Sequence, residues 1–212
     1  MNKKWMFYYF WEFSMSRPIG SGGKAKELNK QEIERISICL TGSTHELRNR
    51  ALFYFCLASG VRVGEAVGLK IKDVKPNGKL LDQVVLEKHS CKSGKSRTIF
   101  ISKQGLDHLK RYLDSRKTLS ADDPLFPTQK KPHEPMGSNV AAQLMAKIFK
   151  RAGIENASSH SCRRSFANAM RRNSVDMEII RQQLGHSSLS ITSAYFNVDS
   201  IEAQRAVDNL RF

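Results

Sequence analysis

Residues 51–69 read ALFYFCLASGVRVGEAVGL, and this stretch decides much of the fold. The segment from Ala51 to Ala58 is strongly apolar, which predicts the buried part of a helix spanning about Thr44 to Ser59. Gly60 predicts the end of this helix, because glycine readily adopts the left-handed conformation that closes helices. A second, short helix is expected over Val63–Leu69. We therefore expect the first of these helices to lie at the centre of the core.

Helical periodicity also occurs on both sides of this stretch. Asn29 and Glu32 have the spacing of a capping box, and apolar residues then recur at helical spacing, so ordered structure is expected from near Asn29. Residues 41–43 are expected to form a loop. Further helices are predicted over Gln104–Arg116, Ser138–Ala152, Ser161–Arg172, Met177–Leu184, Ser188–Asn197 and Ile201–Leu210.

Between these helices the pattern changes to β-type. Lys70–Val74, Leu80–Glu87 and Arg97–Ile101 alternate or are rich in β-branched residues, and Pro-Asn-Gly and Ser-Gly turns separate them. These segments predict a small antiparallel meander. The predicted fold class is therefore mainly α with a small antiparallel β-sheet (α+β). The expected organisation is a flexible or aromatic leader at 1–27, one domain at 28–198 and a tail helix at 199–212.

The charge of the chain points to a polyanionic partner. The 212 residues include 35 Lys and Arg against 20 Asp and Glu, which gives a net charge of +15 and a pI near 9.9. Hydrophobic residues make up 40% of the chain, which excludes a disordered basic tail. Nucleic acid is the simplest partner for such a domain, and an anionic membrane surface is the weaker alternative.

The cysteines and the N-terminus indicate a cytoplasmic protein. Cys39, Cys56, Cys91 and Cys162 are widely spaced and form no Cys-x-x-Cys pair or zinc-type cluster, so reduced thiols and no metal are expected. The apolar segment near the N-terminus is short, is interrupted by Glu12 and lacks a cleavage site, which argues against a signal peptide. It is also too short to span a bilayer. It is interpreted as an aromatic docking arm or, with slight preference, as an extension ahead of a start at Met15.

Several polar residues stand out individually as weak signals. Arg62 lies between apolar segments and Glu65 follows on the same helical face, which is typical of a structural ion pair or of a guanidinium held for anion binding. His160 and Arg163 share a predicted helical face and would suit a phosphate, although an N-terminal His and a solvated Arg are also common. Taken alone, His186 is typical of a loop histidine. Most lone tyrosines serve packing rather than catalysis.

Together and in order, these residues resemble the catalytic signature of the tyrosine recombinase (phage integrase) family. The matching segments are ASGVRVGEAVGL around Arg62, KSGKSRTIFIS from Lys92, HSCRRSFA from His160, LGHSSLSIT from Leu184, and Tyr195. They extend over roughly Leu28 to Phe196, about four-fifths of the chain. The resemblance implies the family's catalytic-domain fold, a double-stranded DNA partner, no cofactor and no metal.

The resemblance also implies a mechanism. Tyr195 attacks a DNA phosphodiester and forms a 3′-phosphotyrosyl link, and a 5′-hydroxyl later resolves that link. Arg62 and Arg163 clamp the non-bridging oxygens, and Lys92 protonates the leaving 5′-oxygen. In this mechanism His160 accepts the proton from Tyr195, and His186 donates a hydrogen bond to the phosphate. Glu65 orients Arg62.

Other positions carry open alternatives. Lys95 is the rival of Lys92 for the acid role, and Lys95, Arg97 and Arg164 are candidate DNA-backbone contacts. The family usually has His-x-Leu-Arg-His, whereas Cys162 and Arg164 replace the Leu and the second His here. The helix near 138–150 is the candidate major-groove element.

The resemblance also concerns assembly. Typical members carry an N-terminal core-binding domain, for which residues 1–27 are too few. This predicts a short recombinase, a truncated form, or a chain that works beside a full-length partner. The expected assembly is a homo-tetramer on two DNA sites, with the tail at 199–212 packing onto a neighbour, and a monomer in solution. Alternative functions are a non-catalytic or accessory DNA-binding protein and a type IB topoisomerase-like enzyme.

Overall fold

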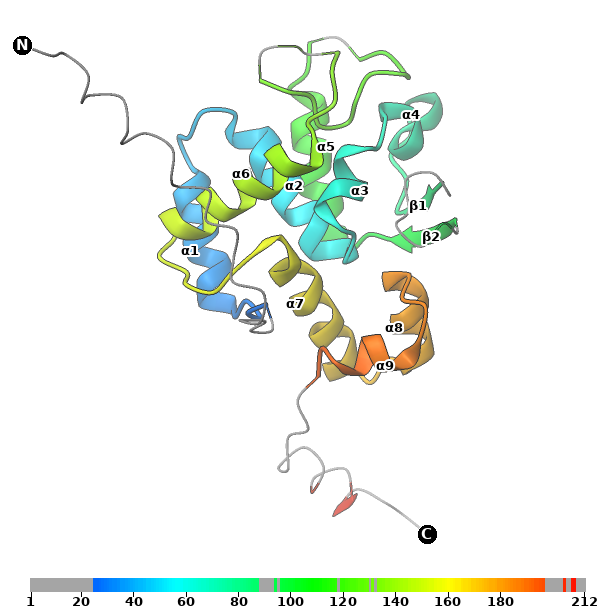
Figure 1. Ribbon diagram of the computed structural model, residues 1–212. Helices are drawn as coiled ribbons and strands as arrows, with labels where there is room; N and C mark the ends of the chain where they lie inside the picture. Colours follow the sequence, from blue (N-terminus) through cyan, green and yellow to red (C-terminus); the bar gives the residue numbers. More distant parts are fainter. Residues whose placement is uncertain are drawn as a thin grey trace, which may run out of the picture.

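Figure 1 shows the computed structural model, which describes residues 25–87, 94, 96–117, 119–129, 131, 133–196, 204, 207 and 208. Helix α2 (Glu46–Ser59) lies at its centre and packs against α1 (Lys30–Leu40), α3 (Val63–Val67), α5 (Lys103–Asp114) and α7 (Ser159–Arg172). The apolar side chains in the middle of α2 are completely buried, at Ala51, Leu52, Phe53, Phe55 and Cys56. The central position predicted for this helix is therefore confirmed.

The remaining helices complete the core. The predicted capping box is present at the start of α1, where Asn29 Oδ1 accepts from the Glu32 N–H at 2.9 Å and Glu32 Oε2 accepts from the Asn29 N–H at 3.0 Å. Helix α6 (Ser138–Arg151) packs on α1 and α3. The last described helices are α8 (Met177–Leu184) and α9 (Leu189–Ser193). The predicted α7 and α8 are confirmed to within two residues at each end.

The β-structure is smaller than the predicted meander. In the described part of the chain, β1 (Gln83–Leu86) and β2 (Arg97–Phe100) form a two-stranded antiparallel sheet in which Val84 pairs with Ile99. The third predicted strand is wrong, because its residues form the short helix α4 (Ile71–Val74), which is followed by the 3₁₀ turn η1 (Pro76–Gly78). Nevertheless, the predicted fold class, mainly α with a small antiparallel sheet, is confirmed.

The reason for the helix at α4 is local. Ile71 and Val74 are three residues apart and both buried, which is the spacing of a helical face rather than of a strand. The Asp73 carboxylate accepts from the Lys70 N–H at 2.8 Å and so satisfies a donor at the start of the turn. In this segment Lys70 forms an isolated antiparallel bridge with Pro124, just before the helix begins.

Helix α7 links the main core to a smaller apolar cluster. Cys162 belongs to the main core, whereas Ala167, one and a half turns later, packs with Ile180 and Leu184 of α8 in the smaller cluster. Tyr195 borders this second cluster. Figure 1 shows α8 and α9 beside the C-terminal half of α7, below the β1–β2 hairpin. This arrangement brings the ends of α2 and α8 toward α7.

Ordered contacts begin slightly before the predicted start near Asn29. The Leu28 N–H donates to Ser165 Oγ at 2.7 Å, and Glu27 pairs with Arg172 of α7 at 2.6 Å. Residues 1–24 of the expected leader, and most of the expected tail helix, lie outside the described residues. No described helix combines the length and apolar character needed to cross a membrane.

Candidate active site

Arg163 is the most deeply buried charged residue at the site. Its side chain sits in the first half of α7 and is only 1% exposed. Nη1 donates to the Gly60 carbonyl at 2.8 Å, and Nη2 donates to the Leu184 carbonyl. These carbonyls belong to the ends of α2 and α8, which both close in the left-handed conformation, with φ of 69° at Gly60 and 66° at Gly185. The guanidinium therefore binds two helix C-termini, where the free carbonyls carry partial negative charge.

The charge of Arg163 is maintained against strong desolvation. Burial and then the nearby positive charge of Arg62 lower its pKa to about 10, against the opposing effects of Tyr195 and Glu65. The Tyr195 contribution includes a hydrogen bond to the guanidinium. At neutral pH Arg163 is therefore a buried cation in contact with the predicted nucleophile.

Glu65 holds two arginines at once. Its carboxylate accepts from Arg62 Nη1 at 3.0 Å, from Arg97 Nη1 at 3.1 Å and from Arg97 Nη2 at 2.7 Å. The side chains of Glu65 and Arg97 are 4% and 9% exposed, respectively, and that of Arg62 is 26% exposed. Burial would raise the pKa of Glu65, but the hydrogen bond and charge of Arg97, followed by the N–H and charge of Arg62, lower it below 4.5. The predicted orienting contact from Glu65 to Arg62 is present.

His186 and Tyr195 lie face to face. Their ring centroids are 5.3 Å apart and the rings are nearly parallel, with an interplanar angle of 3°. His186 is 5% exposed, and its Nδ1 lies 2.9 Å from Thr192 Oγ1. Burial, and then the positive charge of four arginines with Arg163 first, lowers the pKa of His186 to about 3. The imidazole is therefore neutral at physiological pH.

The predicted residues that meet at one place are Arg62, Glu65, Arg163, His186 and Tyr195. Arg97 joins them through Glu65 and through its Nε, which donates to the Gln183 carbonyl at 3.4 Å. Three guanidinium groups and one carboxylate leave an excess of positive charge beside the His186 ring, on which Tyr195 stacks. Guanidinium groups bind phosphate and carboxylate oxygens in forked geometry. The arrangement thus suits an oxyanion beside a phenol nucleophile.

The other predicted site residues are placed differently. His160 is the second residue of α7 and is exposed, with its backbone N–H donating to Ser158 Oγ at 3.3 Å. Arg164 is only 8% exposed, and its Nη1 donates to the Ala25 carbonyl at 3.1 Å. Lys92 and Lys95 lie in the connection between β1 and β2, outside the described residues.

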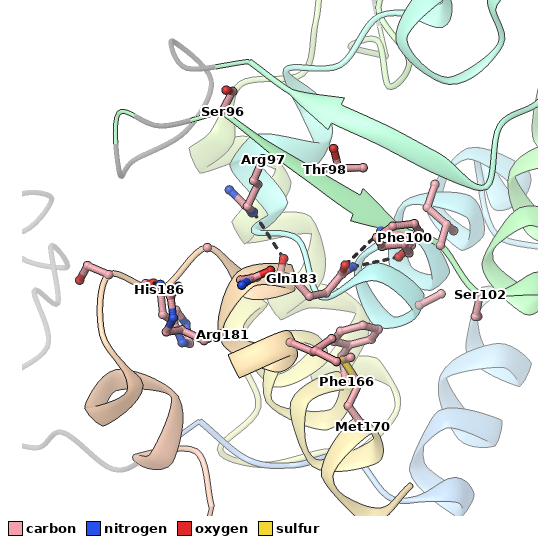
Figure 2. A pocket seen from close by; sticks show the side chains of 16 residues that line it. Ser96, Arg97, Thr98, Phe100, Ser102, Phe166, Met170, Arg181, Gln183 and His186 are labelled. Carbon is pink, nitrogen blue, oxygen red and sulfur yellow. Dashed lines mark hydrogen bonds between the residues drawn. The ribbon is translucent and has the colours of Figure 1, made fainter. Parts of the chain in front are cut away.

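Figure 2 shows a pocket of about 910 Å³ between β2, α7 and α8, on the side of Arg97 and His186. Its wall includes apolar side chains from three elements, at Phe100, Phe166 and Met170. In the described part of the chain, no group of three or more His, Cys, Asp or Glu residues could hold a metal ion.

Two residues at the site were not predicted from the sequence. Gln183 Nε2 donates to the carbonyls of Ser59 and Phe100, both at 3.0 Å, which ties α8 to α2 and to the sheet. Figure 2 shows the contact with Phe100. Thr192 contacts His186 as described above. The signal for Gln183 is an amide on the apolar face of α8, next to Leu184, whereas Thr192 has no distinguishing signal among the small polar residues of its segment.

Comparisons with known proteins show which family this chain resembles in sequence and fold. Residues 26–201 match the sequence profile of the phage integrase family. The tyrosine recombinase XerA of Pyrococcus horikoshii is 30% identical over 188 residues, which cover 88% of this chain and 61% of that relative. A crystal structure of XerA recombinase has a TM-score of 0.70 and 26% identity, covering 88% of this chain and 66% of that one.

A crystal structure of the XerH site-specific recombinase bound to palindromic difH substrate, a post-cleavage complex, has a TM-score of 0.67 and 25% identity. That match covers 89% of this chain and 54% of the XerH chain. The chain therefore spans only about three-fifths of the length of its curated relative XerA.

Proposed function

This chain belongs to the phage integrase family, and we propose that it is a site-specific DNA recombinase that cleaves and rejoins DNA through Tyr195. The observation that carries the proposal is the stacking of Tyr195 on a neutral His186, with the buried Arg163 against both. A hydroxyl nucleophile beside fixed positive charge is the arrangement needed for attack on a phosphodiester.

In the proposed first step, the Tyr195 oxygen attacks the phosphorus and a 3′-phosphotyrosyl bond forms. The bond to the 5′-oxygen breaks, and Lys92 gives that oxygen a proton, while the phenol proton passes to His160. A 5′-hydroxyl then attacks the phosphotyrosyl link in the reverse chemistry and frees the tyrosine. One phosphoester replaces another in each step, so no nucleotide cofactor is required.

Arg62 and Arg163 would bind the non-bridging oxygens, where negative charge grows during the attack. Their positions are supported by independent contacts. Glu65 holds Arg62, and the carbonyls at the ends of α2 and α8 hold Arg163. Because the guanidinium groups of Arg62 and Arg163 are oriented before DNA binds, they need little reorganisation in the transition state.

The assignments of His160 and Lys92 rest on the motif. His160 is exposed at the start of α7, where a DNA phosphate could reach it, and Lys95 stays the rival acid. The near-complete burial of Arg97 and Arg164 favours roles in holding the site together over direct contact with the DNA backbone. Exposed lysines and arginines elsewhere would supply the salt-dependent grip on the duplex.

We further propose that residues 28–198 are the catalytic domain of a homo-tetramer that assembles on two DNA sites, with a monomer in solution. The tail at 199–212 would pack on a neighbouring subunit. Truncation after Asp199 should then impair synapsis more than folding, whereas a truncated monomer that unfolds would argue that the tail serves its own domain.

The test uses a DNA site selected by the protein from a random-sequence pool and built into a nicked suicide duplex. We expect a covalent protein–DNA adduct that Tyr195→Phe abolishes while DNA binding is retained. Tyr54→Phe makes the same chemical change at a buried tyrosine of α2 that stacks on His108, and should leave the adduct intact.

The absence of an adduct on the selected site would contradict catalysis and favour an accessory DNA-binding protein. Relaxation of supercoiled DNA without strand exchange would instead favour a type IB topoisomerase-like enzyme.

A further inference from the structure

Thr192 links the predicted nucleophile to the histidine that stacks on it. The side chain is completely buried, and Oγ1 lies 2.9 Å from His186 Nδ1. The backbone carbonyl of the same residue accepts from the Tyr195 N–H at 3.1 Å. One residue of α9 therefore contacts the ring of His186 through its side chain and the backbone of Tyr195 through its carbonyl.

The direction of the side-chain hydrogen bond follows from the burial of Thr192. A threonine hydroxyl carries one proton, and a buried hydroxyl proton without an acceptor is costly. In the described part of the chain, His186 Nδ1 is the only hydrogen-bond partner of Oγ1. If Nδ1 carried a proton and donated it, the hydroxyl proton would have no acceptor. The hydroxyl is therefore the donor, and Nδ1 accepts.

The protonation of His186 then leaves one arrangement. Burial and the surrounding arginines keep the imidazole neutral, so the ring carries a single proton. Since Nδ1 accepts from Thr192, that proton must be on Nε2. Nε2 makes no hydrogen bond to any of the described residues, so its N–H is available to a ligand in the cationic cluster.

We propose that Thr192 is a positioning residue that fixes His186 in the tautomer protonated on Nε2, so that the ring presents a donor to a phosphate oxygen. The opposite tautomer would direct a lone pair at that oxygen and repel it. A neutral donor also keeps its proton while charge develops, which suits binding of the transition state rather than proton transfer. The tautomer rests on the contacts of Thr192 and the burial of His186, whereas the role toward phosphate rests on the proposed function.

The tautomer is tested by the ring ¹⁵N chemical shifts of His186 in the free full-length protein at neutral pH, assigned by their loss in His186→Gln. We expect an acceptor-type signal from Nδ1 and a protonated signal from Nε2. Thr192→Val keeps the branched shape and removes the hydroxyl, and should shift both signals toward a mixture of tautomers. Thr192→Ser keeps the hydroxyl and should retain the wild-type pattern.

A protonated Nδ1 in the wild-type protein would overturn the proposal, as would wild-type shifts in Thr192→Val. The wild-type spectrum decides the tautomer even where the valine variant fails to fold, which thermal unfolding would reveal.

The catalytic consequence is read from single-turnover formation of the covalent adduct on the suicide duplex. Removing a donor to an oxyanion lowers rates by about 10²–10³-fold. The Thr192 hydroxyl acts only through His186, so Thr192→Val should slow the step by about tenfold. The affinity for DNA should change little, and Thr192→Ser should recover most of the rate.

A valine variant with the wild-type rate would contradict the positioning role. If the wild-type protein itself forms no adduct, the proposed function fails while the ¹⁵N measurement still decides the tautomer.

Discussion

The shared carboxylate of Glu65 gives the sharpest test of how the site is held together. Glu65→Gln keeps the size of the side chain and removes its charge. The carboxylate accepts three hydrogen bonds from Arg62 and Arg97 side chains, and a fourth from the Arg62 N–H at 2.9 Å. A glutamine can offer one oxygen, and its amide N–H groups would face guanidinium donors. The substitution therefore removes the negative charge that faces the nearly buried Arg97 side chain.

The expected loss of stability is large because the pair is buried. Removing one partner of a buried salt bridge costs about 3–5 kcal/mol. Since the amide oxygen of glutamine retains part of the hydrogen bonding, we expect the lower end of that range, about 3 kcal/mol for Glu65→Gln. For a domain of this size, this corresponds to a fall in Tm of roughly 6–12 °C.

The effect should depend on pH in a defined direction. The pKa of Glu65 lies below its ordinary value of 4.5 in the folded protein, so the charged form contributes stability above about pH 4.5. That contribution is lost as the pH falls through the folded pKa. The difference in stability between the wild-type protein and Glu65→Gln should therefore be largest near pH 7 and shrink in acid below pH 4.5.

The assay is urea unfolding of both proteins between about pH 3 and pH 7. Glu34→Gln is the matched control, because it makes the same change at an exposed position of α1. If Glu65→Gln lowers the free energy of unfolding by less than about 1 kcal/mol at pH 7, the pair contributes no more than an exposed ion pair does. That result, or a difference that does not shrink in acid, would refute the reasoning.

Two further substitutions test the surroundings of this cluster. At Gly185 an added Cβ would lie 2.7 Å from Arg97 Cδ, so Gly185→Ala should cost about 2 kcal/mol in unfolding free energy and weaken the adduct-forming step. At Gly42 φ is 69°, close to the 66° of Gly185, and nothing lies within 4 Å of an added Cβ. Gly42→Ala should therefore show the backbone cost alone, and equal losses would exclude the clash. The pKa of His186 is lowered to about 3, so the neutral ring contributes stability above the unfolded pKa that is lost as the pH falls below about 6.5. Between pH 7 and pH 5 the wild-type protein should lose about 2 kcal/mol that His186→Gln does not lose, as measured by urea unfolding, and parallel curves would contradict this assignment.

Most helices could be predicted because their signals are local. The capping box at Asn29, the apolar segment of α2 and the glycine at its end each act through residues a few positions apart. The exception is the segment at 70–74, where β-branched residues favoured a strand. There the burial of Ile71 and Val74 on one side and the cap from Asp73 decided for a helix. Propensity is a weak signal in a segment of five residues, and packing overrides it.

The residues that come together at the site could be predicted from the sequence, whereas their contacts could not all be. Arg62, Glu65, Arg163, His186 and Tyr195 do meet. The sequence pattern gave no reason to separate them from Arg97 as a phosphate contact. Whether an arginine faces solvent or a buried carboxylate depends on a residue 32 positions away, which no local pattern contains. The catalytic roles of these residues stay predictions, as do those of Lys92, His160 and the tail at 199–212.

The sequence by itself determined the family, the mainly helical class and the residue types that meet at the candidate site, because these depend on motifs in order along the chain. Only the tertiary structure decided how those residues are held. The ends of α2 and α8 converge on Arg163, and Glu65 is shared between arginines of α3 and β2. The neutrality of His186 likewise results from burial among cations that come from distant segments. Charge, burial and hydrogen-bond direction are properties of the assembled environment, so they appear only when the chain is folded.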